Sequence, residues 1–520
     1  MIPAAATRAA RVIGWLALGG LGGACHRDPS ASLRRHGDTR STCPAERPGP
    51  PLPPGTAPEH ELAEFWLARY PAPIDGALLG TPARLAHNAR IAQLEDHGWP
   101  VGRWDVQQRA VDHRQLAAEQ QRKLQRLERS LKRGSLVAAE GVSPPQLLHE
   151  LRGTLAHAVA LDQLRVVRAS TALRCLPTAA RVVEPGWLPD FDLLQCSQLR
   201  FGEPVRVLAR AGRQALVWSS YATGWAELAA LSPALTPLQA ERYLRPPRWA
   251  VVASDDAPVW SQPAGSPRQG GALLGLARLG LRLPLADDGA PRAPAPPPSA
   301  PQPTLESVVV VPTAEGLGRG WIATAALAPE PQALTVRQLF ARAFALLHQP
   351  YGWGGTGHRR DCSRLLMDLF ASFGIDLPRS SAQQAAAGVE RLAVAGWPDT
   401  LKAQAIARSA QRGVVLLYLP GHVMLYVGQL GAQLYALHSL SGYLAPCQGG
   451  GETMWRLNRT AITTLALGER SSRRSFLARI TRLMIFSPPE LGPDPPGPMR
   501  PPPALPTPEP PHAPADPRRS

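Results

Sequence analysis

Residues 349–380 read QPYGWGGTGHRRDCSRLLMDLFASFGIDLPRS, and this stretch decides how the last third of the chain is interpreted. A glycine-rich loop, YGWGGTG, precedes Cys362, and an amphipathic run then continues to about Gly374. This pattern predicts a helix that begins at Cys362. The helix dipole lowers the pKa of a thiol in the first turn and favours the nucleophilic thiolate. A cysteine alone is weak evidence, because a free cysteine is often only a small buried hydrophobic residue.

Two histidines downstream strengthen the case for chemistry at Cys362. Residues 413–440, GVVLLYLPGHVMLYVGQLGAQLYALHSL, predict three antiparallel strands, with His422 at the start of the second and His438 on the third. Facing side chains on such strands lie about 5 Å apart, so His438 can orient the ring of His422. Nucleophile, base and orienting residue then follow the arrangement of papain-like acyl transfer. Zinc is the rival use of these residues, but it needs a fourth ligand, so we expect no metal and no cofactor.

The rest of the chain divides by composition into further segments. Residues 59–178 predict a helical region, with Ser143 as an N-cap and Gly134 as a C-cap. Short strands follow in two sets that end alike, in GWAELAAL and GWIATAAL, which indicates two copies of one small β-domain at 179–236 and 245–330. The second copy has a proline-rich insert. Residues 334–488 predict an α+β domain, and 489–520 a disordered proline-rich tail.

The N-terminus resembles an export signal. Residues 1–25 combine Arg8 and Arg11 with the short apolar stretch VIGWLALGGLGGA, and LGGAC places Cys25 where lipoproteins carry their lipid. We therefore expect a lipid on Cys25; an ordinary secretory signal is the alternative. Residues 26–58 predict a proline-rich tether, in which Cys43 is interpreted as incidental. Cys175 and Cys196 are either a disulfide or two unrelated buried thiols.

Composition limits the class of protein. The 520 residues include 57 prolines, most of them in clusters, so we expect several small domains on stiff tethers. The formal charge is +16, but the arginines are scattered and no nucleic-acid motif appears. We therefore expect no nucleic-acid partner, and a monomer.

The motifs YGWGG, DCSR, GIDLPRSSAQQ, GHVMLYVG and ALHS together resemble the NlpC-type family of papain-like bacterial cell-wall cysteine peptidases. The segment AITTLALGERSSRRSFLARITRLMIF is similar to the closing part of the subfamily with two bacterial SH3-like domains. The resemblance covers about residues 55–488. It implies a multi-domain α+β chain: an N-terminal helical stabilising region, two small SH3-like β-barrels and a C-terminal papain-like catalytic domain.

The resemblance also implies a function and a site. The expected reaction is hydrolysis of the bond between γ-D-glutamate and a diamino acid in peptidoglycan stem peptides with a free N-terminal L-alanine. The implied residues are Cys362 as nucleophile, His422 as base, His438 as orienting residue, Tyr351 at the oxyanion, Asp361 and Ser363 at the substrate amine, and Tyr221 in a wall from the first barrel. Asp361 can also simply cap the helix. Arg364 stands where many relatives have glycine.

Two alternatives remain at this point. The chain could be a catalytically spent cell-wall-binding scaffold, or an amidase or transpeptidase that acts on another cell-wall amide. In each case we expect the protein in the cell envelope, facing the periplasm and held on a membrane by the lipid.

Overall fold

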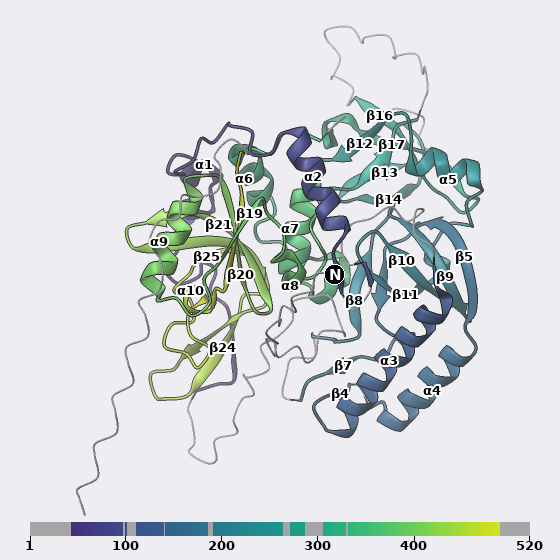
Figure 1. Cartoon of the computed structure of the whole chain (residues 1–520), viewed down its shortest axis with the longest axis horizontal. Helices are drawn as coiled ribbons and strands as arrows, with labels where there is room; N and C mark the ends of the chain where they lie inside the picture. Colours follow the sequence, from purple (N-terminus) through teal and green to yellow (C-terminus); the bar gives the residue numbers. More distant parts are fainter. Residues whose placement is uncertain are drawn as a thin grey trace, which may run out of the picture.

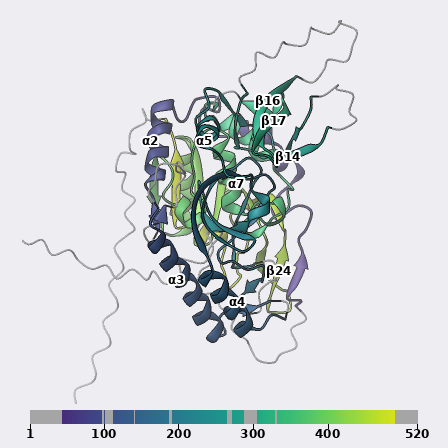
Figure 2. The same ribbon diagram turned by 90° about the vertical axis from the view of Figure 1, so that its right-hand side faces the viewer.

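The structure, a computed structural model, describes residues 43–96, 99–100, 111–139, 141–185, 191–263, 271–286, 305–328 and 331–488. Figure 1 shows an α+β domain formed by the C-terminal part of the chain on the left and two β regions on the right. Helix α7 (Cys362–Ala371) lies between them. Figure 2, turned by 90°, shows α3 and α4 below the β regions.

The C-terminal domain is built on one six-stranded antiparallel sheet in the order β19-β26-β20-β21-β22-β25. The strands are β19 (Glu390–Ala393), β20 (Val414–Leu419), β21 (His422–Leu430), β22 (Gln433–Leu440), β25 (Arg459–Thr464) and β26 (Arg482–Phe486). Its other helices are α6 (Val336–Phe344), α8 (Ser381–Gln384), α9 (Asp399–Ala410) and α10 (Phe476–Arg479). The α+β pattern predicted for 334–488 is therefore present.

Helix α7 is the central element of this domain. Every one of its residues is buried, and it packs against β21 and β22. Asp361 caps its N-terminus by accepting a hydrogen bond from the backbone N–H of Arg364 at 2.8 Å. Just beyond its end, Gly374 has φ +70°, a conformation that favours glycine. The predicted start at Cys362 and end near Gly374 are confirmed.

The first β region is a six-stranded sheet in the order β5-β9-β10-β11-β6-β8. The strands are β5 (Val159–Val166), β6 (Thr171–Arg174), β8 (Gln195–Leu199), β9 (Pro204–Ala211), β10 (Gln214–Ser219) and β11 (Thr223–Glu227). Because β5 and β6 lie within 59–178, the prediction of a wholly helical region there is wrong. The apolar residues of VALDQLRV fit both the helical and the strand period. The segment forms a strand because it pairs with β9.

The second β region consists of two sheets, in the orders β15-β12-β18 and β14-β13-β17-β16. The strands are β12 (Trp249–Val252), β13 (Ala257–Trp260), β14 (Leu273–Ala277), β15 (Arg282–Pro284), β16 (Glu306–Pro312), β17 (Leu317–Ala323) and β18 (Leu327–Ala328). The predicted repeat is visible at its end. Strand β11 runs into the 3-10 turn η2 (Leu228–Ala230), and β17 runs into η3 (Thr324–Ala326) in the same way.

Two helices pack on each other beside the first β region. They are α3 (His113–Lys132) and α4 (Pro144–Ala156), and Ser143 is the N-cap of α4, as predicted. Their shared core contains Leu124, Leu127, Leu131, Leu147, Leu148 and Leu151. Cys175 and Cys196 form a disulfide in the same core, so the pairing alternative holds. The short strands β4 (Val137–Ala138) and β7 (Val182–Val183) pair at its edge.

The N-terminal described segment lies on the C-terminal domain. Its elements are β1 (Glu46–Pro48), η1 (Pro58–Glu61), α1 (Ala63–Leu67), α2 (Thr81–Ala92), β2 (Glu95–Asp96) and β3 (Trp99–Pro100). Strand β1 pairs in parallel with β24 (Glu452–Arg456), which also pairs with β23 (Tyr443–Pro446). Trp66 is fully buried against Tyr435 and Gly428, where any Cβ would lie 2.6 Å from its ring. Residues 43–58 are therefore docked rather than a free tether.

Cys43 forms a disulfide with Cys447, which lies in the turn between β23 and β24. The interpretation of Cys43 as incidental is wrong. The two cysteines are 404 residues apart, so no local pattern could have connected them.

Several predictions lie outside the described residues. They are the signal at 1–25 with Cys25, the proline-rich insert and the tail at 489–520. Within the part that the structure describes, no helix is long and apolar enough to cross a membrane.

A buried ionic network joins the three parts of the molecule. Asp368 on α7 accepts hydrogen bonds from Arg200 of the first β region, from Arg360, and from Arg364 at 2.8 Å. Arg360 also pairs with Asp255 of the second β region through two 2.7 Å hydrogen bonds. Burial alone would raise the pKa of Asp368, but the three arginines hold it well below its usual range.

We expect Asp368→Asn to destabilise the protein by about 3–5 kcal/mol, because it leaves buried guanidinium charges without their shared carboxylate. Chemical denaturation followed by tryptophan fluorescence measures this change. The control is Asp162→Asn, which removes a half-exposed partner of Arg206 and is expected to cost at most about 1 kcal/mol. Equal effects of the two substitutions would contradict the role given to the network.

Candidate active site

Cys362 occupies the first position of α7, immediately after the capping residue Asp361. Its side chain is fully buried. Ser439 on β22 donates a hydrogen bond to the carbonyl of Arg360 at 2.9 Å, which ties this strand to the start of α7. The helix position is the one expected of an activated thiol.

His422 and His438 are in direct contact. The Nε2 atom of His422 and the Nδ1 atom of His438 lie 2.6 Å apart, and the ring centroids 4.9 Å apart. The register of the two strands pairs Leu425 with Leu437, so the histidines are diagonal rather than directly opposite neighbours. The predicted pairing of a base with an orienting residue is therefore geometrically satisfied. Helix α7, which Cys362 begins, packs against both of these strands.

A short helix that the sequence reasoning missed covers the two histidines. The ring of Phe476 on α10 lies 5.8 Å from the ring of His422 and 5.3 Å from that of His438. Burial, and then the charge of Arg479, lower the pKa of His422 to about 3. Burial, and then His422, lower the pKa of His438 well below its ordinary value. Both rings are therefore neutral at pH 7, the state in which an imidazole can act as a base.

Asp361 is bound by groups of the protein itself. Arg379 donates two hydrogen bonds to its carboxylate, at 3.1 and 2.7 Å, and Ser363 donates one at 3.1 Å. Arg379 also donates to Ser197 of the first β region at 2.8 Å. Helix capping by Asp361 is confirmed. A substrate ammonium at this place would have to share the carboxylate with Arg379.

The glycine loop forms the 3-10 turn η4 (Trp353–His358) and packs against β8. Gly354 and Gly355 have φ +60° and +84°. A Cβ at Gly354 would lie 2.6 Å from Gln195 Cγ, and one at Gly355 would lie 3.2 Å from Gln198 Cβ. The glycines therefore allow a close approach to the first β region.

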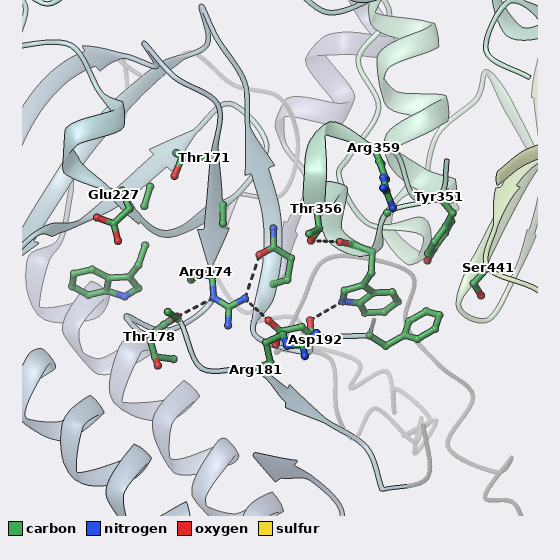
Figure 3. A pocket seen from close by; sticks show the side chains of 18 of the residues that line it. Thr171, Arg174, Thr178, Arg181, Asp192, Glu227, Tyr351, Thr356, Arg359 and Ser441 are labelled. Atoms are coloured by element: carbon green, nitrogen blue, oxygen red, sulfur yellow. Dashed lines mark hydrogen bonds and ion pairs between the residues drawn. The ribbon is translucent and has the colours of Figure 1, made fainter. Parts of the chain in front are cut away.

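A cavity of about 450 Å³ lies between this loop and the first β region. Figure 3 shows Tyr351, Arg359 and Ser441 on one side of it and Arg174, Asp192 and Glu227 on the other. Trp353 forms part of its wall and donates a hydrogen bond to the carbonyl of Asp192 at 2.8 Å.

Tyr351 connects this cavity to the start of α7. It is half-buried and forms an isolated β-bridge with Arg360. Burial, and then the charge of Asp361, raise the pKa of its hydroxyl well above the ordinary value. Tyr351 therefore keeps its proton at neutral pH and can donate a hydrogen bond toward the cavity.

Tyr221 is buried at the contact between the first β region and α7. Its hydroxyl donates to Glu203 at 2.6 Å, and the guanidinium of Arg364 lies 4.9 Å from its ring centre. Arg364 also pairs with Glu203 at 3.0 Å. Tyr221 thus helps to hold the first β region against α7, and its predicted contact with substrate stays a prediction.

The structure places the predicted site residues on or beside α7 and on the two strands that pack against it. Asp361, Cys362 and Ser363 lie at the start of the helix, and His422 and His438 lie on β21 and β22. Tyr351 forms a β-bridge with Arg360, and Tyr221 contacts Arg364. Cys25 lies outside the described residues. Within the described ranges, no group of three or more His, Cys, Asp or Glu side chains is placed to hold a metal ion.

Comparison with known proteins gives a family for the C-terminal domain. Residues 348–452 match the NlpC/P60 family. An NlpC/P60 endopeptidase from Photobacterium damselae subsp. piscicida has the same fold, with a TM-score of 0.60 and 15% identity over 80% of this chain and 95% of its own.

Two further solved structures are similar over smaller parts of the chain. An NlpC/P60 family protein from Bacillus cereus has a TM-score of 0.41 and 15% identity over 62% of this chain and 100% of its own. The peptidoglycan hydrolase RipB from Mycobacterium tuberculosis has a TM-score of 0.18 and 21% identity over 29% of this chain and 63% of its own. Among curated proteins, none matches.

We expect the free energy of unfolding to fall as the pH drops below 6.5. Below that pH, His422 and His438 bind protons in the unfolded chain. In the folded protein their buried rings stay unprotonated, in the case of His422 down to about pH 3. Each ring contributes at most about 1.4 kcal/mol per pH unit. Urea denaturation between pH 7.5 and 4.5 measures the slope.

His438→Asn is expected to reduce this slope by the contribution of one proton. The control is His149→Asn, which removes an exposed histidine from α4. A slope that is the same in the wild type and in His438→Asn would contradict the neutral buried pair.

Gly354→Ala is expected to destabilise the protein more than Gly431→Ala. Both glycines have a positive φ, +60° and +55°, so alanine costs a similar backbone strain of about 1 kcal/mol at each. Only Gly354 faces a neighbour, whereas a Cβ at Gly431 meets no atom within 4 Å. The difference of about 1–3 kcal/mol measured by denaturation reports the packing against β8. Equal losses would show that this packing is loose.

Proposed function

Because residues 348–452 of this chain form an NlpC/P60 domain, we propose that the protein is a thiol peptidase of the bacterial cell wall. The observation that carries the proposal is the His422–His438 pair, which lies on the two strands packed against the helix that Cys362 begins. This arrangement supports the proposed roles of Cys362 as nucleophile, His422 as base and His438 as orienting residue in acyl transfer.

The proposed reaction has two steps. His422 takes the proton of the Cys362 thiol, and the thiolate attacks the carbonyl carbon of the scissile amide. The C–N bond then breaks as His422 gives that proton to the departing amine. A thioester remains on Cys362. His422 then takes a proton from water, the hydroxide attacks the thioester, and the acid product and the thiol are released. Tyr351, whose hydroxyl keeps its proton, is the proposed donor to the oxyanion.

The proposed scissile bond joins γ-D-glutamate to a diamino acid, in stem peptides whose N-terminal L-alanine is free. Asp361 and Ser363 adjoin Cys362 and are the proposed contacts of the substrate amine. The cavity beside Tyr351 is large enough for part of a short peptide, and of the proposed catalytic residues it is Tyr351 that lines it. Its wall from the first β region supports selection of small, released peptides over intact glycan strands.

The surrounding parts of the chain have proposed roles as well. We propose that both β regions are SH3-like domains, as the shared ending of β11–η2 and β17–η3 supports. Tyr221 would position the first of them against α7. We also propose that the protein is exported and held on a membrane by a lipid on Cys25, because the LGGAC motif resembles a lipoprotein cleavage site.

The decisive experiment is incubation of the reduced protein with L-Ala-γ-D-Glu-diaminopimelate and mass spectrometry of the products. We expect release of L-Ala-γ-D-Glu and free diaminopimelate. Cys362→Ala should abolish release, and His422→Ala should reduce it by at least about 100-fold, since general acid–base catalysis is worth about 10²–10⁴-fold. The reductant is included so that Cys362 reacts as a thiol and is not oxidised during the assay.

Four other outcomes are informative. Activity retained by Cys362→Ala would refute the mechanism, and no activity in the reduced wild type would favour a binding scaffold. Cleavage or transfer at another amide would indicate an amidase or transpeptidase. Equal rates with the N-acetylated tripeptide would show that Asp361 does not select a free amine.

A further inference from the structure

Both ring nitrogens of His438 have partners in the protein. Nδ1 lies 2.6 Å from Nε2 of His422, and Nε2 lies 2.8 Å from the hydroxyl oxygen of Thr463. Thr463 is on β25, which pairs with β22 on the side away from β21. Both His438 and Thr463 have no exposed surface. The row of hydrogen-bonded groups therefore continues one residue beyond the histidine pair and ends inside the domain.

The role of His422 as a base determines which ring nitrogen of each histidine carries a proton. A neutral imidazole has one N–H and one bare nitrogen. His422 uses Nε2 for His438, so its Nδ1 is the atom left for the thiol. A base must present this Nδ1 without a proton, and its proton then resides on Nε2 and is donated to His438 Nδ1. Because that nitrogen accepts, His438 must carry its own proton on Nε2.

The Nε2–H of His438 thus needs a buried acceptor, and the hydroxyl of Thr463 is the group at hydrogen-bonding distance. The edge of the His438 ring is also covered by Phe476, whose ring plane is inclined by 88° to it. A donor left without a partner in such a place is costly, so loss of the acceptor favours the other tautomer of His438.

We propose that Thr463 is a positioning residue: it accepts the hydrogen bond of His438 Nε2–H and so fixes the tautomers of both histidines. Its effect on the reaction rests on the proposed function, whereas the proton positions can be measured without activity. In the opposite arrangement of hydrogen bonds, the hydroxyl of Thr463 donates to Nε2 of His438. This arrangement places a proton on Nδ1 of His438 and another on Nδ1 of His422, and the latter can then accept no proton from a thiol.

The proton positions can be measured by ¹⁵N NMR of protein labelled in the histidine rings, at pH 7.5. Protonated and bare ring nitrogens have well-separated shifts, and the signals of His438 are identified by their absence in His438→Asn. We expect a proton on Nε2 of His438 in the wild type. This result is expected to persist in Thr463→Ser and to be lost or mixed in Thr463→Val. A wild-type protein with the proton on Nδ1 of His438 would overturn the proposal even if Thr463→Val does not fold.

Kinetics of the same variants test the effect on the reaction. Thr463→Val is expected to lower kcat about 10- to 100-fold and to change KM less than about 2-fold, since Thr463 does not touch substrate. Thr463→Ser should stay within about 3-fold of the wild type. The matched control is Thr464→Val, the next residue on β25, whose side chain points to the other face and contacts Gly55. Wild-type kcat in Thr463→Val would also overturn the proposal.

The two proposals can fail separately. If the reduced wild type cleaves no stem peptide, the proposed function fails, but the ¹⁵N spectra still decide whether Thr463 fixes the tautomers. If the wild type is active and the spectra of Thr463→Val are unchanged, only the role of Thr463 is lost.

Discussion

The assembly depends on one buried carboxylate, that of Asp368, which binds three arginines at once. One of them, Arg200, belongs to the first β region, and another, Arg360, also pairs with Asp255 of the second. A buried guanidinium without a counter-charge is strongly destabilising. The buried arginines therefore keep their carboxylate partners only when the C-terminal domain and both β regions are docked together. Since Asp368 is on the helix that Cys362 begins, the position of the thiol is coupled to the docking of both β regions.

Local sequence patterns were enough to predict the elements around the thiol. The cap at Asp361, the amphipathic run after Cys362 and the positive-φ glycine near its end are all contained within a few residues of one another. The strands of His422 and His438 were predictable for the same reason. Their pairing in space required only that two adjacent hairpin strands lie in register, which tight turns ensure.

The features that could not be predicted are those that depend on distant partners. The segment at 159–166 has no local preference strong enough to distinguish strand from helix, and β9 decides it. The partner of Cys43 lies at the other end of the chain, and the docking of Trp66 depends on a glycine in β21. Phe476 is on a helix of only four residues, too short to give a periodic signal.

The disulfide between Cys43 and Cys447 and the pairing of β1 with β24 attach the N-terminal segment to the C-terminal domain. An N-terminal lipid anchor would therefore be connected to that domain first. If Cys25 carries a lipid, the 17 residues 26–42 separate it from Cys43, and an extended chain of that length spans roughly 60 Å. Tension from the membrane would then act on the C-terminal domain directly. The β regions would not lie between the anchor and this domain, so they would not carry the tension. The length of the linker would limit how far the Cys362 thiol can lie from the bilayer.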